Sequence, residues 1–159
     1  MINFIQSDFI NDPTSKKIMS LLNKEGDLAR FVGGCVRDSL INIRTKDIDI
    51  ATKYKPEKII EILSSNSIKV IPTGIDYGTV SVFTNNFNFE ITTLRSDIET
   101  DGRHAKVSFT DDWKEDSMRR DFTINSIYLS PNGDIFDPNN GTLDLAKGSV
   151  IFIGDPKER

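Results

Sequence analysis

The chain contains RFVGGCVRD at residues 30–38 and, after a short gap, KDIDI at residues 46–50. The first stretch begins with apolar residues typical of a short strand, passes through two glycines and continues into a segment with helical character. The second stretch alternates acidic and apolar residues, as a strand with one polar and one apolar face does. Together they predict a strand, a glycine turn and a helix, followed by a second strand that carries its acids on one face.

The acids of the second stretch are candidate metal ligands. Asp47 and Asp49 are two residues apart, so in a strand both carboxylates emerge on the same face. Like charges this close repel each other unless a cation lies between them, and Mg²⁺ is usually bound by one or two carboxylates together with substrate phosphates. The alternative is an acidic strand edge in contact with solvent, since an Asp-x-Asp pattern is a short motif.

The glycine turn is a candidate phosphate cradle. Gly33 and Gly34 let backbone N–H groups approach an anion closely, and the start of the following helix adds a favourable dipole. Arg37 can offer a charged fork to a phosphate. The alternatives are an ordinary strand-to-helix turn and, for Arg37, a structural ion pair with Asp38 or another acid. The combination of cradle, arginine and paired acids in one short run favours the nucleotide-binding interpretation.

These motifs resemble a known family. The pattern Gly33-Gly34-x-x-Arg37-Asp38, the pair Asp47-x-Asp49 and the later run RRDFTIN at residues 119–125 are similar to the head domain of the bacterial-type tRNA nucleotidyltransferase and poly(A) polymerase family, within the DNA polymerase beta-like nucleotidyltransferase superfamily. The resemblance covers residues 28–156. It implies an α+β nucleotidyltransferase head domain over residues 1–159, with a twisted mixed β-sheet, helices packed mainly on one face, and the neck, body and tail domains of the family absent.

The resemblance also implies further site residues. Glu90 stands in a context similar to that of the family's third catalytic carboxylate, provided that its strand lies beside the Asp47 strand; the alternative is an acid on a solvated strand face. Arg120 and Asn125 correspond to residues beside the incoming triphosphate. For Arg119 and Arg120 the alternative is that arginines late in a helix, after acids early in it, complement the helix dipole.

Composition limits the classes of function. A chain of 159 residues with 37% hydrophobic and 28% charged residues is typical of one soluble globular domain. No segment approaches the roughly 18 consecutive apolar residues of a membrane span, and the N-terminus does not have the pattern of a secretory signal, so we expect no membrane partner and a cytoplasmic location. The net charge of −4 predicts that RNA is held mainly by regions outside this chain; the alternative is a local basic patch that the average charge conceals. The single cysteine, Cys35, is predicted to be a buried packing residue.

The remaining pattern predicts the other elements. A helix should open at Asp12-Pro13 and end by Gly26. Further helices are predicted over residues 56–63 and 111–121, the latter with Trp113 as a packing anchor. Strands are predicted over residues 68–71, 78–84, 87–94, 127–129, 133–136 and 150–153. Residues 95–106 are polar and lack periodicity, which favours a mobile loop; Arg103 and His104 within it could touch RNA or triphosphate, although a solvated loop is the simpler interpretation.

The resulting hypothesis is template-independent nucleotidyl transfer from ATP or CTP to the 3′ end of RNA, above all tRNA. Asp47 and Asp49, with Glu90, would hold two Mg²⁺ ions that activate the RNA 3′-hydroxyl and stabilise charge at the α-phosphate. Gly33, Gly34, Arg37 and Arg120 would hold the triphosphate. Because the family places base selection in its neck, we expect this chain alone to bind nucleotide weakly, with little base preference and little or no activity.

Three alternatives to this hypothesis stay open. The first is poly(A) addition to RNA, because the motifs serve both activities. The second, from another class, is a non-catalytic nucleotide-binding or interaction domain; it is disfavoured because Asp47 and Asp49 are both present. The third is a small self-contained nucleotidyltransferase that modifies a protein or small molecule, which the acidic charge favours and the run at residues 119–125 disfavours.

Overall fold

The computed structural model describes residues 8–98 and 106–154 of the chain. Within these residues a twisted seven-stranded sheet has the order β3-β4-β5-β2-β1-β8-β9. The strands of this sheet are β1 Ala29–Val32, β2 Asp47–Thr52, β3 Ile71–Gly74, β4 Thr79–Phe83, β5 Asn88–Thr93, β8 Tyr128–Leu129 and β9 Ile135–Phe136. β2 and β5 pair in parallel, whereas the other neighbours pair antiparallel, so the predicted mixed sheet is confirmed.

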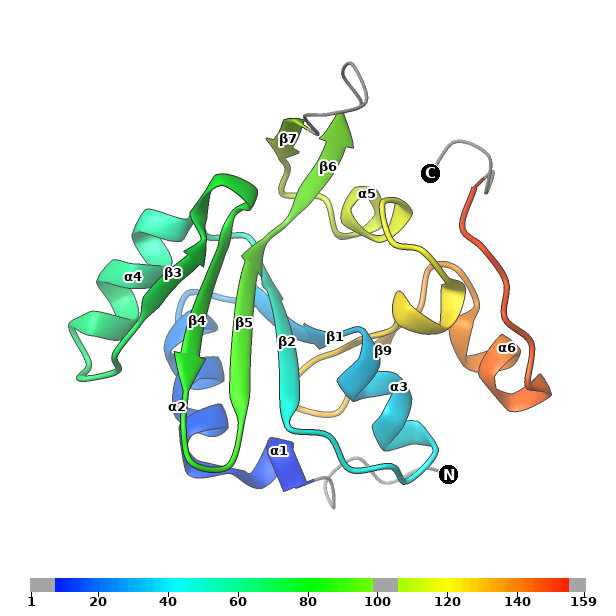
Figure 1. The fold of residues 1–159 in the computed structure, drawn as a ribbon, viewed down its shortest axis with the longest axis horizontal. Coiled ribbons are helices and arrows are strands. Elements are labelled where there is room, and N and C mark those ends of the chain that lie inside the picture. The colour runs from blue at the N-terminus through cyan, green and yellow to red at the C-terminus, as the bar shows by residue number, and fades with distance from the viewer. Residues whose placement is uncertain (1–7, 99–105, 155–159) are drawn as a thin grey trace.

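Helices cover one face of this sheet along most of its width (Figure 1). The helices on this face are α1 Asp8–Asn11, α2 Pro13–Leu22, α3 Gly34–Leu40 and α4 Pro56–Ser64. α2 begins as predicted, because the Asp12 carboxylate accepts a hydrogen bond from the backbone N–H of Ser15 (3.0 Å). The main core lies between these helices and the sheet, and its larger members are Phe9, Ile18, Leu22, Phe31, Ile48, Ile50, Ile59, Leu63, Phe89 and Ile91. Cys35 is buried in this core, which confirms its predicted packing role.

A smaller core lies on the opposite face. Val32 and Ala51 alternate with core residues along β1 and β2, so their side chains point away from α2 and α4. They pack with Leu94, Trp113 and Tyr128. Trp113 belongs to α5 Trp113–Met118, and its indole ring meets the Tyr128 ring edge-on with centroids 5.6 Å apart. The predicted role of Trp113 as a packing anchor is confirmed.

The segment at residues 95–106 differs from the predicted loop. Arg95–Ile98 forms β6 and Lys106–Phe109 forms β7, and the two strands pair antiparallel in a separate two-stranded sheet. The pairing rests on backbone hydrogen bonds, which polar side chains do not prevent, so the loop prediction is wrong for these strands. Arg103 and His104 lie outside the described residues.

Other boundaries also differ. The strand predicted at residues 68–71 begins only at Ile71, because Ser67 takes a left-handed conformation (φ 64°) and the Ile68 N–H still bonds to the Leu63 carbonyl at the end of α4. The helix predicted over 111–121 is the shorter α5, which leaves Arg119 and Arg120 beyond its last turn.

The C-terminal part contains a helix where the sequence predicted only strands. α6 Gly141–Lys147 packs beside the short 3-10 helix η3 Thr123–Asn125. Instead of a strand at 150–153, the structure has an isolated bridge between Phe122 and Phe152. α6 forms because the Asp137 carboxylate accepts the N–H groups of Gly141 (2.7 Å) and Thr142 (2.9 Å).

Candidate active site

Asp47 and Asp49 on β2 and Glu90 on β5 form what we call the carboxylate wall. The parallel register places Asp49 directly beside Glu90, and Asp47 beside Asn88. Asn88 Nδ2 donates a hydrogen bond to Asp47 Oδ1 (3.2 Å). Asp47 and Glu90 are exposed and Asp49 is half-buried. The condition set for Glu90, that its strand lie beside the acidic strand with the polar faces aligned, is met.

Asp49 carries an electrostatic cost. Burial and, to a smaller extent, the neighbouring charges of Glu90 and Asp47 together raise the pKa of its carboxyl group from 3.8 to about 6, against a lowering effect of Arg120. The negative charge of Asp49 is therefore less favourable than that of an ordinary aspartate, which loses its proton near pH 3.8. A cation bound between these acids would remove that cost, so the electrostatics of the carboxylate wall favour a bound cation.

The glycine turn brings the backbone against this acid. Gly33 has φ +82°, which favours glycine, and a Cβ built on it would lie 3.5 Å from Asp49 Oδ2. A Cβ on Gly34 would lie 3.3 Å from Arg37 Nη2. The helix α3 begins at this turn, so the small residues keep its first turn open between Asp49 and Arg37.

Arg37 links the turn to the C-terminal half of the chain. Its Nη1 donates to Asn125 Oδ1 (2.7 Å), and Asn125 Nδ2 donates in turn to Asp121 Oδ1 (3.0 Å). Its Nε also pairs with Asp38 Oδ1 (3.0 Å), so the structural ion pair considered as the alternative is present as well. The guanidinium therefore has structural partners and still lines the cleft described below.

Arg119 and Arg120 form what we call the arginine wall. Both pair with the fully buried Asp116: Arg119 Nε at 3.1 Å and Arg120 Nη2 at 3.0 Å. Arg120 Nε also donates to the Tyr128 hydroxyl (3.2 Å). Since both arginines lie beyond the last turn of α5, an ion pair with Asp116, more than the helix dipole, accounts for their positions.

A cleft of about 320 Å³ separates the two walls. It is lined by Gly33, Gly34, Arg37, Asp49, Arg119, Arg120, Asp121 and Asn125. Six of these were predicted site residues, whereas Asp47 and Glu90 lie on the carboxylate wall outside the lining. Arg119 and Asp121 were quoted in the motif at 119–125 but were not assigned to the site. Their position in that motif, next to Arg120, was the available signal.

The acidic side chains at this cleft can be compared with the ligands that a divalent metal ion requires. Over residues 8–98 and 106–154, no group of three acidic, histidine or cysteine side chains is arranged to hold a metal ion. Two aligned carboxylates at the edge of a cleft with arginines opposite fit the mode in which Mg²⁺ takes one or two carboxylates and completes its shell with phosphate oxygens and water. Asp47 and Asp49 therefore fit the ion as a partial site that substrate completes.

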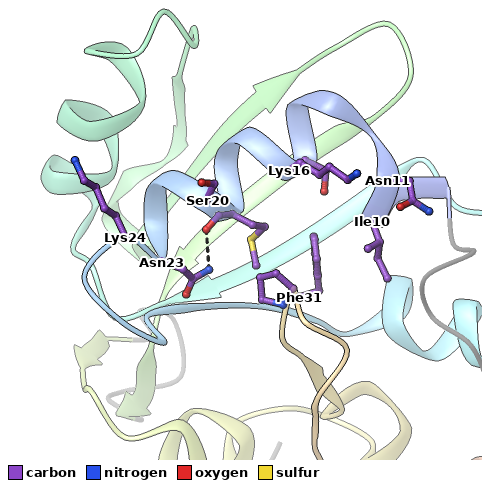
Figure 2. Close-up of a pocket in the computed structure, with 10 residues that line it drawn as sticks. Ile10, Asn11, Lys16, Ser20, Asn23, Lys24 and Phe31 are labelled. Atoms are coloured by element: carbon purple, nitrogen blue, oxygen red, sulfur yellow. Dashed lines mark hydrogen bonds between the residues drawn. The ribbon is translucent and has the colours of Figure 1, made fainter.

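A larger hollow of about 530 Å³ lies elsewhere, between α2, Phe31 of β1 and Pro131 (Figure 2). Its lining contains no Asp, Glu, His or Cys; the charged groups there are Lys16 and Lys24. It shares no lining residue with the cleft between the carboxylate wall and the arginine wall. Size alone therefore does not identify the functional site, and the chemistry points to the smaller cleft.

Sheet, glycine turn and cleft together define the class: an α+β nucleotidyltransferase-type head, with acids on two adjacent strands facing basic residues across a cleft. The match to known families is consistent with this class. Residues 29–151 match the family described as the poly A polymerase head domain, and the chain belongs to this family.

The chain is also similar to individual proteins of known name. It is 43% identical over 145 residues to the mouse mitochondrial CCA tRNA nucleotidyltransferase 1, covering 91% of this chain and 33% of the relative. It is 39% identical over 147 residues to the CCA-adding enzyme of Limosilactobacillus fermentum, covering 91% of this chain and 36% of that protein. The chain thus spans about a third of the length of these relatives.

Solved structures agree in fold. The Bacillus stearothermophilus CCA-adding enzyme in complex with CTP superposes with a TM-score of 0.77 at 34% identity, over 93% of this chain and 35% of that one. The Thermotoga maritima CCA-adding enzyme complexed with tRNA superposes with a TM-score of 0.67 at 26% identity, over 95% of this chain and 35% of that one. None of the helices described here is long and apolar enough to cross a membrane.

Proposed function

We propose that this chain is the catalytic head of an enzyme that adds nucleotides from CTP or ATP to the 3′ end of tRNA without a template, with Mg²⁺ as the metal. The observation that carries the proposal is the cleft itself. It sets the half-buried acid Asp49 and the glycine turn opposite Arg119 and Arg120. Such a cleft suits a magnesium–triphosphate, which needs acids for the ion and cations for the phosphates.

Each wall has a separate task in this reaction. Asp47 and Asp49 would hold Mg²⁺, and the bound ion would supply charge stabilisation to the nucleotide phosphates and to the attacking hydroxyl. Glu90, in register with Asp49 and exposed at its side, would complete the acidic triad of the metal site. Arg37 and Arg120 bind the β- and γ-phosphates, the backbone of Gly33 and Gly34 lets these phosphates approach, and Asn125 keeps Arg37 in place through its 2.7 Å hydrogen bond.

tRNA is favoured over other RNA by the named relatives. The mouse relative is named as a CCA tRNA nucleotidyltransferase and the Limosilactobacillus fermentum relative as a CCA-adding enzyme. Of the two superposed structures, one is a complex with CTP and the other a complex with tRNA. The poly A polymerase name of the family leaves AMP addition as the second candidate. The cytoplasm is the proposed location, although the mouse relative is named as mitochondrial.

The test compares the chain with an Asp49→Ala variant in an addition assay. Labelled CTP or ATP and Mg²⁺ are incubated with tRNA that lacks its CCA end and, separately, with an unrelated RNA. We expect weak incorporation on the tRNA by the unsubstituted chain and a loss of at least about 10³-fold in the variant, with the thermal unfolding transition preserved. Equal incorporation by the variant would contradict the assignment of Asp49, and ATP addition to both RNAs alike would favour poly(A) synthesis.

A further inference from the structure

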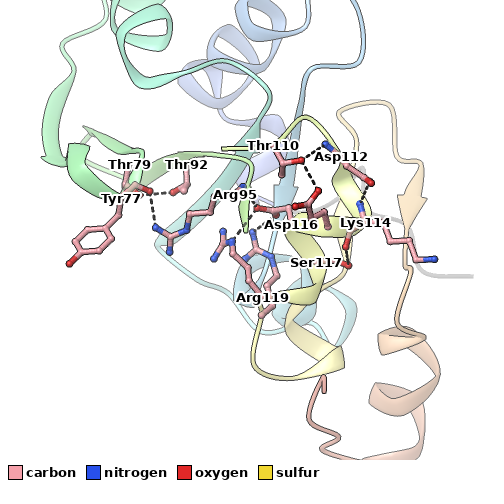
Figure 3. Close-up of polar contacts among 12 residues, drawn as sticks. Tyr77, Thr79, Thr92, Arg95, Thr110, Asp112, Lys114, Asp116, Ser117 and Arg119 are labelled. Carbon is pink, nitrogen blue, oxygen red and sulfur yellow. Dashed lines mark hydrogen bonds and ion pairs between the residues drawn. The ribbon is translucent and has the colours of Figure 1, made fainter. Parts of the chain in front are cut away.

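Behind the arginine wall, the carboxylate of Asp116 receives four hydrogen bonds from four residues. Its Oδ1 accepts from the backbone N–H of Arg95 (3.0 Å) and from Arg119 Nε (3.1 Å). Its Oδ2 accepts from Arg120 Nη2 (3.0 Å) and from the Tyr128 hydroxyl (2.6 Å). Figure 3 shows Arg95 and Arg119 meeting at Asp116 between the strand and α5. The side chain of Asp116 has no exposed surface, so its four partners replace water completely.

The charges of this cluster do not cancel. Burial opposes ionisation of Asp116, but Arg120 and Arg119 outweigh it and lower the pKa of the carboxyl group, so Asp116 is negatively charged at neutral pH. One negative charge is thus shared between two guanidinium groups that would otherwise repel each other. The cluster of Asp116, Arg119 and Arg120 keeps a net positive charge of one, and it is this positive side that lines the cleft.

The hydrogen bonds to Asp116 and Tyr128 also fix the orientation of the arginine side chains. Arginine has a long flexible stem, and a guanidinium binds a phosphate well only when its planar fork is aimed at it. Arg120 is held at two atoms, by Asp116 and by Tyr128, and its guanidinium carbon lies 5.5 Å from the centre of the Tyr128 ring. Arg120 is also near enough to Asp49 to lower the pKa of that acid, so its position affects both walls of the cleft.

We propose that Asp116 is a positioning residue for nucleotide binding: it holds Arg119 and Arg120 side by side with their positive charge directed at the triphosphate. This rests on the proposed function of the cleft. Asp116 does not touch the nucleotide and acts only through the two arginines. A purely structural alternative is that Asp116 merely ties α5 to β6 through the Arg95 N–H.

The experiment measures binding of inorganic tripolyphosphate, with Mg²⁺, to the full chain and to Asp116→Asn by calorimetry. We expect the variant to bind at least about tenfold more weakly, since the asparagine fills the same space without the charge that pairs the arginines. The side-chain Nε–Hε NMR signals of Arg119 and Arg120 should shift and broaden, while that of Arg44, which pairs with Asp8 (3.3 Å), should not. A merely structural tie leaves the binding constant unchanged, whereas the Arg119 signal shifts in either case because its Nε donates directly to Asp116.

A double-mutant cycle separates positioning from general damage. In an Arg120→Gln background, Asp116→Asn should weaken tripolyphosphate binding by less than about threefold. The reason is that one of the two arginines through which Asp116 acts is already absent. Thr93→Val is the matched control: it removes a buried hydroxyl that bonds to the Tyr54 carbonyl (2.7 Å) and should not affect binding. If Asp116→Asn does not fold, Tyr128→Phe removes only the shared hydroxyl and should weaken binding about threefold.

Two results would overturn the assignment. One is tripolyphosphate binding by Asp116→Asn, or by the substitute Tyr128→Phe, within the error of the unsubstituted chain. The other is an equal loss of binding with and without Arg120→Gln. Failure of the unsubstituted chain to bind tripolyphosphate at all is a different outcome, because it refutes the proposed function of the cleft and the assignment falls with it.

Discussion

The carboxylate wall gathers acids side by side, whereas the arginine wall arranges cations around a single buried acid. On the first, Asp49 lies in register with Glu90, and burial and like charge raise its pKa to about 6. On the second, Asp116 is satisfied by two arginines, a tyrosine and a backbone N–H. The two walls face each other across a narrow cleft and have opposite electrostatic consequences for the protein without its substrate.

This difference assigns different roles in stability to residues of one site. An acid held among acids opposes folding, so removing its charge should stabilise the fold while it removes function. A cation paired with a buried acid supports folding, because its removal leaves an uncompensated buried charge. If the proposed function is correct, the carboxylate wall gives up stability for metal binding, and on the arginine wall stability and phosphate binding depend on the same contacts.

The largest effect on stability is expected from Arg120→Gln. Loss of this guanidinium leaves Asp116, which has no exposed surface, with one positive partner fewer, and breaking a buried pair in this way costs about 3 kcal/mol or more. Urea unfolding at pH 7 measures the change. The matched control is Lys58→Gln, which breaks the exposed Lys58–Glu61 pair (3.4 Å) and should cost less than about 1 kcal/mol. Similar losses in both variants would remove the distinction between the arginine wall and an ordinary surface ion pair.

A smaller effect of opposite sign is expected from Asp49→Asn in metal-free buffer. Because the folded-state pKa of Asp49 is raised to about 6 from 3.8, the folded protein binds a proton more tightly than the unfolded chain does. The contribution of Asp49 to the stability of the unsubstituted chain is thus largest below about pH 4 and is lost as the pH rises through about 6. The variant should be more stable by roughly 1–3 kcal/mol at pH 7.

The pH dependence of that difference provides the check. In unfolding curves recorded with a chelator, the stability advantage of Asp49→Asn should shrink as the pH falls from 6 to 4, since Asp49 then becomes neutral in the unsubstituted chain. Asp116 changes in the other direction: its lowered pKa gives stability that is lost as the pH falls below its unfolded value, in both proteins alike. An advantage that stays constant or grows toward acid would show that Asp49 carries no such cost.

The carboxylate wall could be predicted from the sequence because its geometry is local. A period of two along KDIDI places Asp47 and Asp49 on one face, and the glycine turn follows from two adjacent residues. The pairing of β2 with β5, which brings Glu90 beside Asp49, was not local, and the family resemblance supplied it. Exposure of Asp47 and burial of Ile48 and Ile50 follow the same alternation.

The arginine wall could be located from the sequence but not explained by it. The motif at 119–125 identified Arg120 and Asn125. The residue that holds Arg120 is Asp116, which is fully buried, whereas acids in a helix rich in acidic residues are usually exposed to solvent. Helical spacing from Trp113 puts Asp116 on the buried face and Glu115 on the exposed one, but the spacing does not identify the arginines that Asp116 binds. The β6–β7 hairpin and α6 were missed for a similar reason: backbone pairing formed the first, and the Asp137 carboxylate, accepting N–H groups of the first turn, supports the second.

The smallest effect is expected from Asn88→Ala, which tests how far the carboxylate wall is organised before the ion binds. Asn88 Nδ2 donates to Asp47 Oδ1 across the parallel strands at 3.2 Å, and both side chains are exposed, so the hydrogen bond contributes little to stability, about 0.5 kcal/mol or less. A hydrogen bond to a metal-binding carboxylate orients that ligand, and its loss typically weakens metal affinity roughly 10–100-fold. Because both side chains are exposed here, we expect the smaller loss of about tenfold in Mg²⁺ affinity.

Titration with Mg²⁺ in the presence of tripolyphosphate measures the change. Asn86→Ala, in the exposed turn before β5, is the control and should leave Mg²⁺ affinity unaltered. If Asn88→Ala leaves the Mg²⁺ affinity unaltered as well, the Asn88 hydrogen bond does not orient Asp47 for the ion. The bound ion itself then orients the carboxylate.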